Sequence, residues 1–271
     1  MGWTYTAIQF GSHFVQSRRW DSFHSPALFR LFTHCCNEQD HPESFDSIER
    51  QRDKLKSSSD LITRKDFGAG SKHNPESTKE RISAIASHAL SFPFQGRFLS
   101  RLAGFIHPEV IVEFGTSLGI SASYLAVGAS EAKVFTIEGD PAVSAVATRV
   151  FMDLGLSNIS INTLSFDQYV DGLRNNHLTV DLLFLDGHHT SAATIHYYQA
   201  MRKFLHPGSI VIIDDLYWSA DMQACWQKLI ALPEVTQSVD CFHFGMLFLN
   251  PDFQQKENHI IRLPLKMQLK K

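Results

Sequence analysis

Short, continuous apolar runs separated by helical patterns dominate the chain from about residue 110 onward. The runs are VIVEF (110–114), KVFTIE (133–138), ISINTL (159–164), VDLLFLD (180–186) and SIVIID (209–214). Unbroken Val, Ile, Leu and Phe are typical of strands that are buried on both faces of a parallel sheet. Helices are predicted between these runs, and one has a clear beginning, with Asp140 as N-cap and Pro141 at the first helical position.

Two further apolar runs, SVDCF and GMLFLN, are separated only by His243 and Phe244 at the turn. Such a connection is too short for a crossover, so this pair is predicted to be antiparallel. The pattern therefore predicts an α/β protein with a doubly wound, Rossmann-like seven-stranded sheet. Five of its strands are parallel, and the antiparallel pair closes it at the C-terminal end.

The first 76 residues contain little strand pattern. We expect residues 1–76 to form a helical N-terminal extension and a lid-like loop, and residues 77–271 to form the main domain. Within the extension, SPALFRLFTHCC (25–36) places Leu28, Leu31 and Phe32 on one helical face. Ser77 and Glu80 have the spacing of a capping box, which predicts that an amphipathic helix begins there.

The composition excludes several classes of protein. The 271 residues are 44% apolar and carry a net charge of −3, which is ordinary for a globular protein and argues against a nucleic-acid binder. No apolar stretch approaches the roughly 20 residues that a membrane-spanning helix needs, and the N-terminus lacks the pattern of a signal peptide. The four cysteines form no CxxC pair, so we expect buried thiols in a reducing, cytoplasmic location. We also expect no membrane partner. A homodimer is one option for its assembly.

Candidate chemistry gathers where the first strand ends, because ligands of such sheets bind beyond the carboxyl ends of the strands. The turn there has the spacing G-x-x-x-G and lacks the extra glycine of a pyrophosphate-binding loop. Glu113 precedes this turn and would repel a phosphate, whereas it would attract a cationic amino group. The predicted cofactor-binding residues of this turn are Glu113, Gly115, Thr116, Ser117, Gly119 and Ser121.

The ends of the next two strands carry the rest of this predicted site. Glu138, followed by Gly139, stands where an acidic side chain can accept hydrogen bonds from ribose hydroxyls. Phe166 and Asp167 offer an aromatic face and a carboxylate for an adenine ring. A ligand with adenine, ribose and a cationic amino-acid tail fits this set, so S-adenosylmethionine is the predicted cofactor. A second glycine-rich segment, DFGAGS (66–71), lacks a preceding apolar strand, and we expect it to be a lid or a substrate-facing loop.

Residues from about 95 to 250 resemble class I S-adenosylmethionine-dependent methyltransferases, and most closely the catechol O-methyltransferase-like group. The resemblance rests on VEFGTSLGISASYLA, VFTIEGDP, SFDQY, LLFLDGHH, LHPG and IIDD. FHSPALF, DFGAGS and DDLYWS resemble a bacterial branch of these enzymes. The resemblance implies that residues 77–271 are the methyltransferase domain and that the acceptor is a small molecule.

Acidic residues at the ends of the fourth and fifth strands form the predicted catalytic group. Asp186, Asp214 and Asp215 could share Mg²⁺ or another divalent cation, as the resemblance also implies, and Asp186 is expected to contact the cofactor as well. A bound metal would lower the pKa of an acceptor hydroxyl. His189 stands where the family often has a lysine base, so His189 and Asp186 are the predicted catalytic residues. Trp218 and Tyr217 are either walls of an acceptor pocket or packing residues.

Metal-assisted O-methylation of a small-molecule hydroxyl is the function that this reading favours. A metal-independent N- or C-methyltransferase remains open, and so does an NAD-linked oxidoreductase, although the missing glycine disfavours the latter. A binding module without activity is a third alternative. Such a module would not require the G-x-x-x-G turn, Glu138 and the acidic residues at the ends of the fourth and fifth strands all together.

Overall fold

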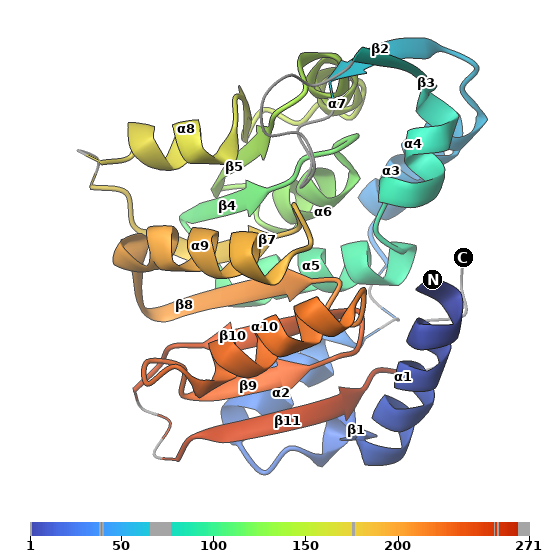
Figure 1. The fold of residues 1–271 in the computed structure, drawn as a ribbon. Coiled ribbons are helices and arrows are strands. Elements are labelled where there is room, and N and C mark those ends of the chain that lie inside the picture. The colour runs from blue at the N-terminus through green and yellow to red at the C-terminus, as the bar shows by residue number, and fades with distance from the viewer. Residues whose placement is uncertain are drawn as a thin grey trace. The chain divides into compact units, whose positions relative to one another are not determined.

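The chain forms two compact units in a computed structural model, which describes residues 2–37, 39, 41–65, 77–174, 177–251, 253 and 255–264 (Figure 1). The first unit is built from Met1–Thr33 and His177–Lys266, and the second from His34–Asn176. The predicted boundary between residues 76 and 77 stays a prediction. The predicted DFGAGS lid lies outside the described residues.

Three parallel strands pair with one another in the second unit. β4 (Val110–Phe114) pairs with β5 (Lys133–Glu138), and β5 pairs with β6 (Ile159–Thr163). The helices around them are α5 (Pro93–Ile106), α6 (Ile120–Gly128), α7 (Pro141–Asp153) and α8 (Phe166–Gly172). Asp140 caps α7 as predicted, because its side chain accepts hydrogen bonds from the backbone amides of Ala142 and Val143.

Two helices, one from each side of the predicted boundary, complete the core of the second unit. These are α3 (Glu43–Ser57) and α4 (Ile82–Ala89). Their apolar side chains pack with those of α6 and α7 in one cluster, whose fully buried members include Phe45, Ile48, Leu118 and Tyr124. Residues on both sides of the predicted boundary therefore share this core.

A hairpin of β2 (Leu61–Lys65) and β3 (Ser77–Arg81) replaces part of a predicted helix. The helix expected from Ser77 begins only at Ile82, so the capping-box prediction is wrong. Ser77 and Glu80 lie in β3, where their backbone groups pair with β2 instead of starting a helix. Thr63 pairs with Lys79, and Arg64 pairs with Thr78. Pairing with a distant segment has overridden a local helical signal here.

The first unit carries a mixed sheet. β7 (Val180–Leu185) is parallel to β8 (Leu205–Asp214), and β10 (Phe244–Phe248) is antiparallel to both β8 and β9 (Gln237–Asp240). The predicted antiparallel C-terminal pair is thus confirmed. Two strands that were not predicted extend this sheet, since β11 (Glu257–Arg262) is parallel to β9, and β1 (Arg18–Arg19) is parallel to β11. The predicted total of seven strands is therefore too low.

The remaining helices of the first unit are α1 (Gly2–Gln16), α9 (Ser191–Met201), α10 (Ala220–Ala231) and the short 3₁₀ helices Trp20–Ser22 and Arg202–Phe204. α2 (Pro26–Cys35) confirms the predicted helix over residues 25–36. All four cysteines are buried thiols, as expected. None of the helices in the described ranges combines the length and apolar character that a bilayer crossing needs.

Candidate functional site

The turn after β4, which we call the glycine loop (Gly115–Gly119), has a backbone that ordinary residues adopt rarely. The φ angles of Gly115, Ser117 and Gly119 are 109°, 47° and 86°. A Cβ atom on Gly119 would lie 2.7 Å from Cε1 of Phe151, so α6 can begin here only without a side chain at this position. The backbone amides of Gly115 and Thr116 both donate to the carbonyl of Ile137, which fastens the loop to β5.

A chain of hydroxyl groups connects the glycine loop to Glu113 at the end of β4. Thr136 Oγ1 donates to Glu113 Oε2 at 2.5 Å, and Thr116 Oγ1 lies 2.5 Å from Thr136 Oγ1. Because the Thr136 hydroxyl has one proton and gives it to Glu113, Thr116 must be the donor in the second bond. Thr136 is a polar residue within an otherwise apolar strand, and this contrast is the feature of the sequence that could have indicated its hydrogen bond to Glu113.

The carboxyl group of Glu113 is completely buried. Burial raises its pKa to about 7, and the charge of Glu138 acts in the same direction, while the hydroxyls of Ser121 and Thr136 oppose the rise. Its second oxygen, Oε1, has no hydrogen-bond partner among the described residues. A buried acceptor without a partner is costly, so this oxygen is suited to a donor supplied by a ligand.

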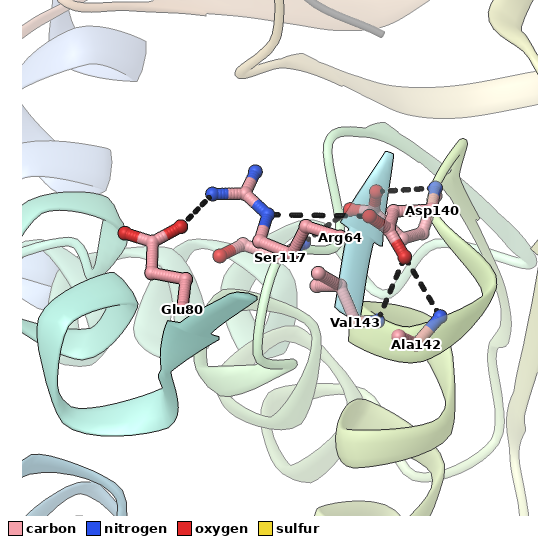
Figure 2. A network of polar contacts seen from close by, with 7 residues as sticks. Arg64, Glu80, Ser117, Asp140, Ala142 and Val143 are labelled. Atoms are coloured by element: carbon pink, nitrogen blue, oxygen red, sulfur yellow. Dashed lines mark hydrogen bonds and ion pairs between the residues drawn. The ribbon is translucent and has the colours of Figure 1, made fainter. Parts of the chain in front are cut away.

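Glu138 joins the end of β5 to the glycine loop. Its two carboxylate oxygens accept from the backbone amide of Ser117 at 3.0 Å and from that of Asp140 at 2.9 Å. Burial raises the pKa of Glu138 most, and Asp140 raises it further, whereas the two amides and Arg64 lower it. Figure 2 shows this network together with Arg64 and Glu80, which belong to the β2–β3 hairpin.

The other predicted cofactor residues, apart from Asp186, lie in the same unit. Ser121 is buried in the first turn of α6, and Gly139 follows Glu138. Phe166 is buried and packs edge-to-face on Phe114, with ring centroids 5.0 Å apart. Asp167 is exposed in the first turn of α8. Their contacts with adenine stay predictions, and in this structure Phe166 serves the core.

The first unit places the predicted base between two carboxylates. His189 Nε2 lies 3.9 Å from Asp186 Oδ1, and His189 Nδ1 lies 3.6 Å from Asp215 Oδ2. Burial raises the pKa of Asp215, and the charge of His189 opposes this rise. His188, His189 and Asp215 all have positive φ, at 64°, 27° and 55°. Backbone of this kind is costly and is concentrated at functional sites.

Binding of a divalent cation by Asp186, Asp214 and Asp215 stays a prediction. Within the described ranges, no group of three or more His, Cys, Asp or Glu side chains is arranged to hold a metal ion. Asp214 is buried at the end of β8, whereas Asp186 and Asp215 flank His189. The prediction rested on the proximity of two strand ends, and such proximity does not fix the direction of three side chains.

Tyr217 and Trp218 differ in their surroundings. Tyr217 donates to Asp240 Oδ2 at 2.7 Å, and its ring stacks on Phe242 at 4.7 Å. His13 of α1 also approaches Asp240, at 3.2 Å. Trp218 is 63% exposed, and its ring centroid lies 6.1 Å from that of His189. Tyr217 is therefore a packing residue, while Trp218 offers an accessible aromatic face beside the histidine.

The segment that carries these features matches a known family. A family model described as a methyltransferase domain covers residues 112–216, which extend from β4 through the glycine loop and Glu138 to Asp186 and Asp215. The chain is thus similar to methyltransferase domains over these residues.

One curated relative is similar to part of the chain. A protein named "Probable O-methyltransferase" from Mycobacterium tuberculosis is 30% identical over 118 residues, which are 40% of this chain and 50% of the relative. The chain thus matches about half the length of this curated relative.

Solved structures of methyltransferases share the fold of this chain. The O-methyltransferase from Bacillus cereus, in complex with S-adenosylhomocysteine, is 16% identical over 77% of this chain and 92% of its own, with a TM-score of 0.56. A methyltransferase from Podospora anserina, also bound to S-adenosylhomocysteine, is 16% identical over 84% of this chain and 97% of its own, with a TM-score of 0.57. The predicted α/β fold of class I methyltransferases is confirmed.

Proposed function

We propose that this protein is an S-adenosylmethionine-dependent O-methyltransferase that acts on a hydroxyl group of a small molecule. The observation that carries the proposal is the buried carboxyl of Glu113 with an oxygen that lacks a partner. A pyrophosphate would be repelled there, whereas the ammonium group of an amino-acid tail would supply both the missing donor and an opposite charge. The cofactor content of the two structural relatives described above supports the same ligand class.

The residues of the second unit fit such a cofactor. Glu113 would hold the ammonium group, the glycine loop would lie against the amino-acid tail, and Glu138 would accept from the ribose hydroxyls. When bound, S-adenosylmethionine supplies a methyl group on a positively charged sulfur, which is a good leaving group. Positioning of the two reacting atoms provides much of the acceleration in such transfers.

His189 of the first unit is the proposed general base. It would accept the proton of the acceptor hydroxyl, whose oxygen becomes a better nucleophile as it loses that proton. The carboxylates of Asp186 and Asp215 then stabilise the positive charge that His189 acquires. Base catalysis of this kind contributes about 100- to 10,000-fold to a rate. Asp186 is thus a residue that supports the base.

We derive no step through a divalent cation, because the described residues include no group of three or more His, Cys, Asp or Glu side chains that could hold one. O-methylation is therefore expected to persist in EDTA. A strict requirement for Mg²⁺ would instead return Asp186, Asp214 and Asp215 to the role of metal ligands. The cytoplasmic location and the homodimer stay predictions.

The test is a transfer assay with S-adenosylmethionine and a panel of phenols, catechols, aliphatic alcohols and amines, read by mass spectrometry. We expect a methyl ether from a hydroxyl compound, and a rate at least 100-fold lower in His189→Asn. His196→Asn, on the helix α9 that follows, is the matched control and is expected to retain the rate. Methylation of amines alone, or full activity of His189→Asn, would contradict the proposal.

A further inference from the structure

The β2–β3 hairpin brings an arginine to the acidic end of the candidate cofactor site. Arg64 Nη1 donates to Glu80 Oε2 at 2.7 Å across the two strands of the hairpin. On its other side, Arg64 Nε lies 4.0 Å from Asp140 Oδ2, at the start of α7 (Figure 2). The hairpin lies outside the 112–216 segment that matches the methyltransferase family.

We propose that Arg64 is a positioning residue of the cofactor site, which brings a fixed positive charge to the carboxylates of Asp140 and Glu138 where the ribose would bind. The inference rests on the proposed function, since it concerns the same cofactor. It assigns a role to an N-terminal segment that the sequence pattern alone had left without one.

The arrangement of charge around Glu138 explains why such a residue is needed. Three carboxyl groups, those of Glu113, Glu138 and Asp140, interact at this end of the sheet. Arg64 is the cation that acts on Glu138 from the hairpin, and the backbone amides of Ser117 and Asp140 supply the remaining stabilisation. A protonated Glu138 would have to give up an acceptor position, so its ability to bind two ribose hydroxyls depends on its charge.

The contact between Arg64 and Asp140 acts through charge and not through a hydrogen bond. The 4.0 Å separation is too long for a hydrogen bond, and Arg64 Nε is buried without a hydrogen-bond partner in the described ranges. Asp140 also uses its other oxygen to cap α7, at 2.7 Å from the amide of Ala142. Glu80 fixes the far side of the guanidinium, so the charge is held in place from two directions.

The experiment is calorimetric titration of the full-length protein with S-adenosylhomocysteine at pH 6.0 and pH 8.5. The variants are Arg64→Met, which removes the charge, and Arg64→Lys, which keeps it. Arg81→Met is the matched control, because Arg81 lies on the same hairpin but donates to the carbonyl of Ser59. Protonation of Glu113 contributes to binding by the wild type as well, so each dissociation constant is compared with that of the wild type at the same pH.

We expect Arg64→Met to weaken binding about tenfold at pH 6.0 and about twofold at pH 8.5, because loss of a nearby cation raises the pH at which a carboxylate takes up a proton. Arg64→Lys should restore most of the affinity at pH 6.0, and Arg81→Met should bind like the wild type. A loss in Arg64→Met that is equal at both pH values, or is not rescued by lysine, would show a merely structural role and overturn the inference. Wild-type protein that binds no S-adenosylhomocysteine would instead refute the proposed function itself.

Discussion

Gly119 offers a sharp test of the glycine loop, because two separate costs of a side chain can be read from the structure. Its φ of +86° favours glycine, and an alanine with this backbone costs about 1 to 2 kcal/mol. The added Cβ would also meet the Phe151 ring at 2.7 and 3.0 Å and the Ala147 Cβ at 3.1 Å. Phe151 is buried, so relief of this contact requires repacking, which costs typically about 1 to 3 kcal/mol. Gly119→Ala should therefore lower the free energy of unfolding by about 3 kcal/mol.

Gly155 provides the control for the backbone contribution. Its φ is +66°, but nothing lies within 4 Å of the position that a Cβ would take. Gly155→Ala should thus cost only the backbone part, about 1 kcal/mol. Both variants are measured by urea unfolding followed by circular dichroism, with the m-value checked for constancy. Equal stability of the two variants, within about 0.5 kcal/mol, would refute the packing argument at Gly119.

Three further predictions concern buried polar groups. Without cofactor, Glu113 stabilises the folded state at pH values below its ordinary pKa, and this stabilisation is lost as the pH rises through about 7. The free energy of unfolding of Glu113→Gln, measured in urea, should therefore rise by about 3 kcal/mol relative to that of the wild type between pH 4.5 and 8.5. A difference that stays constant with pH would contradict this. Thr136→Val removes a hydroxyl that lowers the pKa of Glu113. Relative to the wild type, calorimetry should show a larger loss of S-adenosylhomocysteine affinity at pH 7 than at pH 9, and equal losses at both pH values would count against this. Tyr217→Phe deprives the buried Asp240 of a donor and should cost about 1.5 to 3 kcal/mol in thermal or urea unfolding, whereas a neutral effect would show that the bond contributes nothing.

The strands that hold the candidate site were predictable because their sequences are locally unambiguous. Ile111, Val112 and Phe114 surround Glu113 with apolar neighbours, and all of them are buried in β4 as the pattern predicts. Asp140 followed by Pro141 likewise fixes the start of α7 through a local capping interaction. Elements whose signals lie within a few neighbouring residues were therefore predicted well.

Elements that depend on distant partners were missed. β2 reads LITRK, in which charged residues hide the strand, and its pairing with β3 is set by contacts across the hairpin. β1 consists only of Arg18 and Arg19, and it exists because β11 lies beside it. The role of Arg64 could not be found from spacing either, since Asp140 is 76 positions away along the chain.

The predicted acidic trio shows a different limit. Sequence reasoning placed Asp186 and Asp215 correctly at the ends of neighbouring strands. It could not show that His189 stands between them, because the positive φ angles of His188, His189 and Asp215 turn these residues in ways that no regular strand predicts. Side-chain direction at irregular backbone was the missing information.

The measurement that tests the central claim most directly compares two nucleosides that differ only in the charged tail. S-adenosylhomocysteine and 5′-methylthioadenosine share adenine, ribose and sulfur, but only the former carries an ammonium group for Glu113. We predict that the wild-type protein binds S-adenosylhomocysteine at least about 100-fold more tightly, a difference of about 3 kcal/mol, and that Glu113→Gln removes most of this preference. Equal affinity of the wild type for both nucleosides, or tighter binding of NAD, would contradict the account.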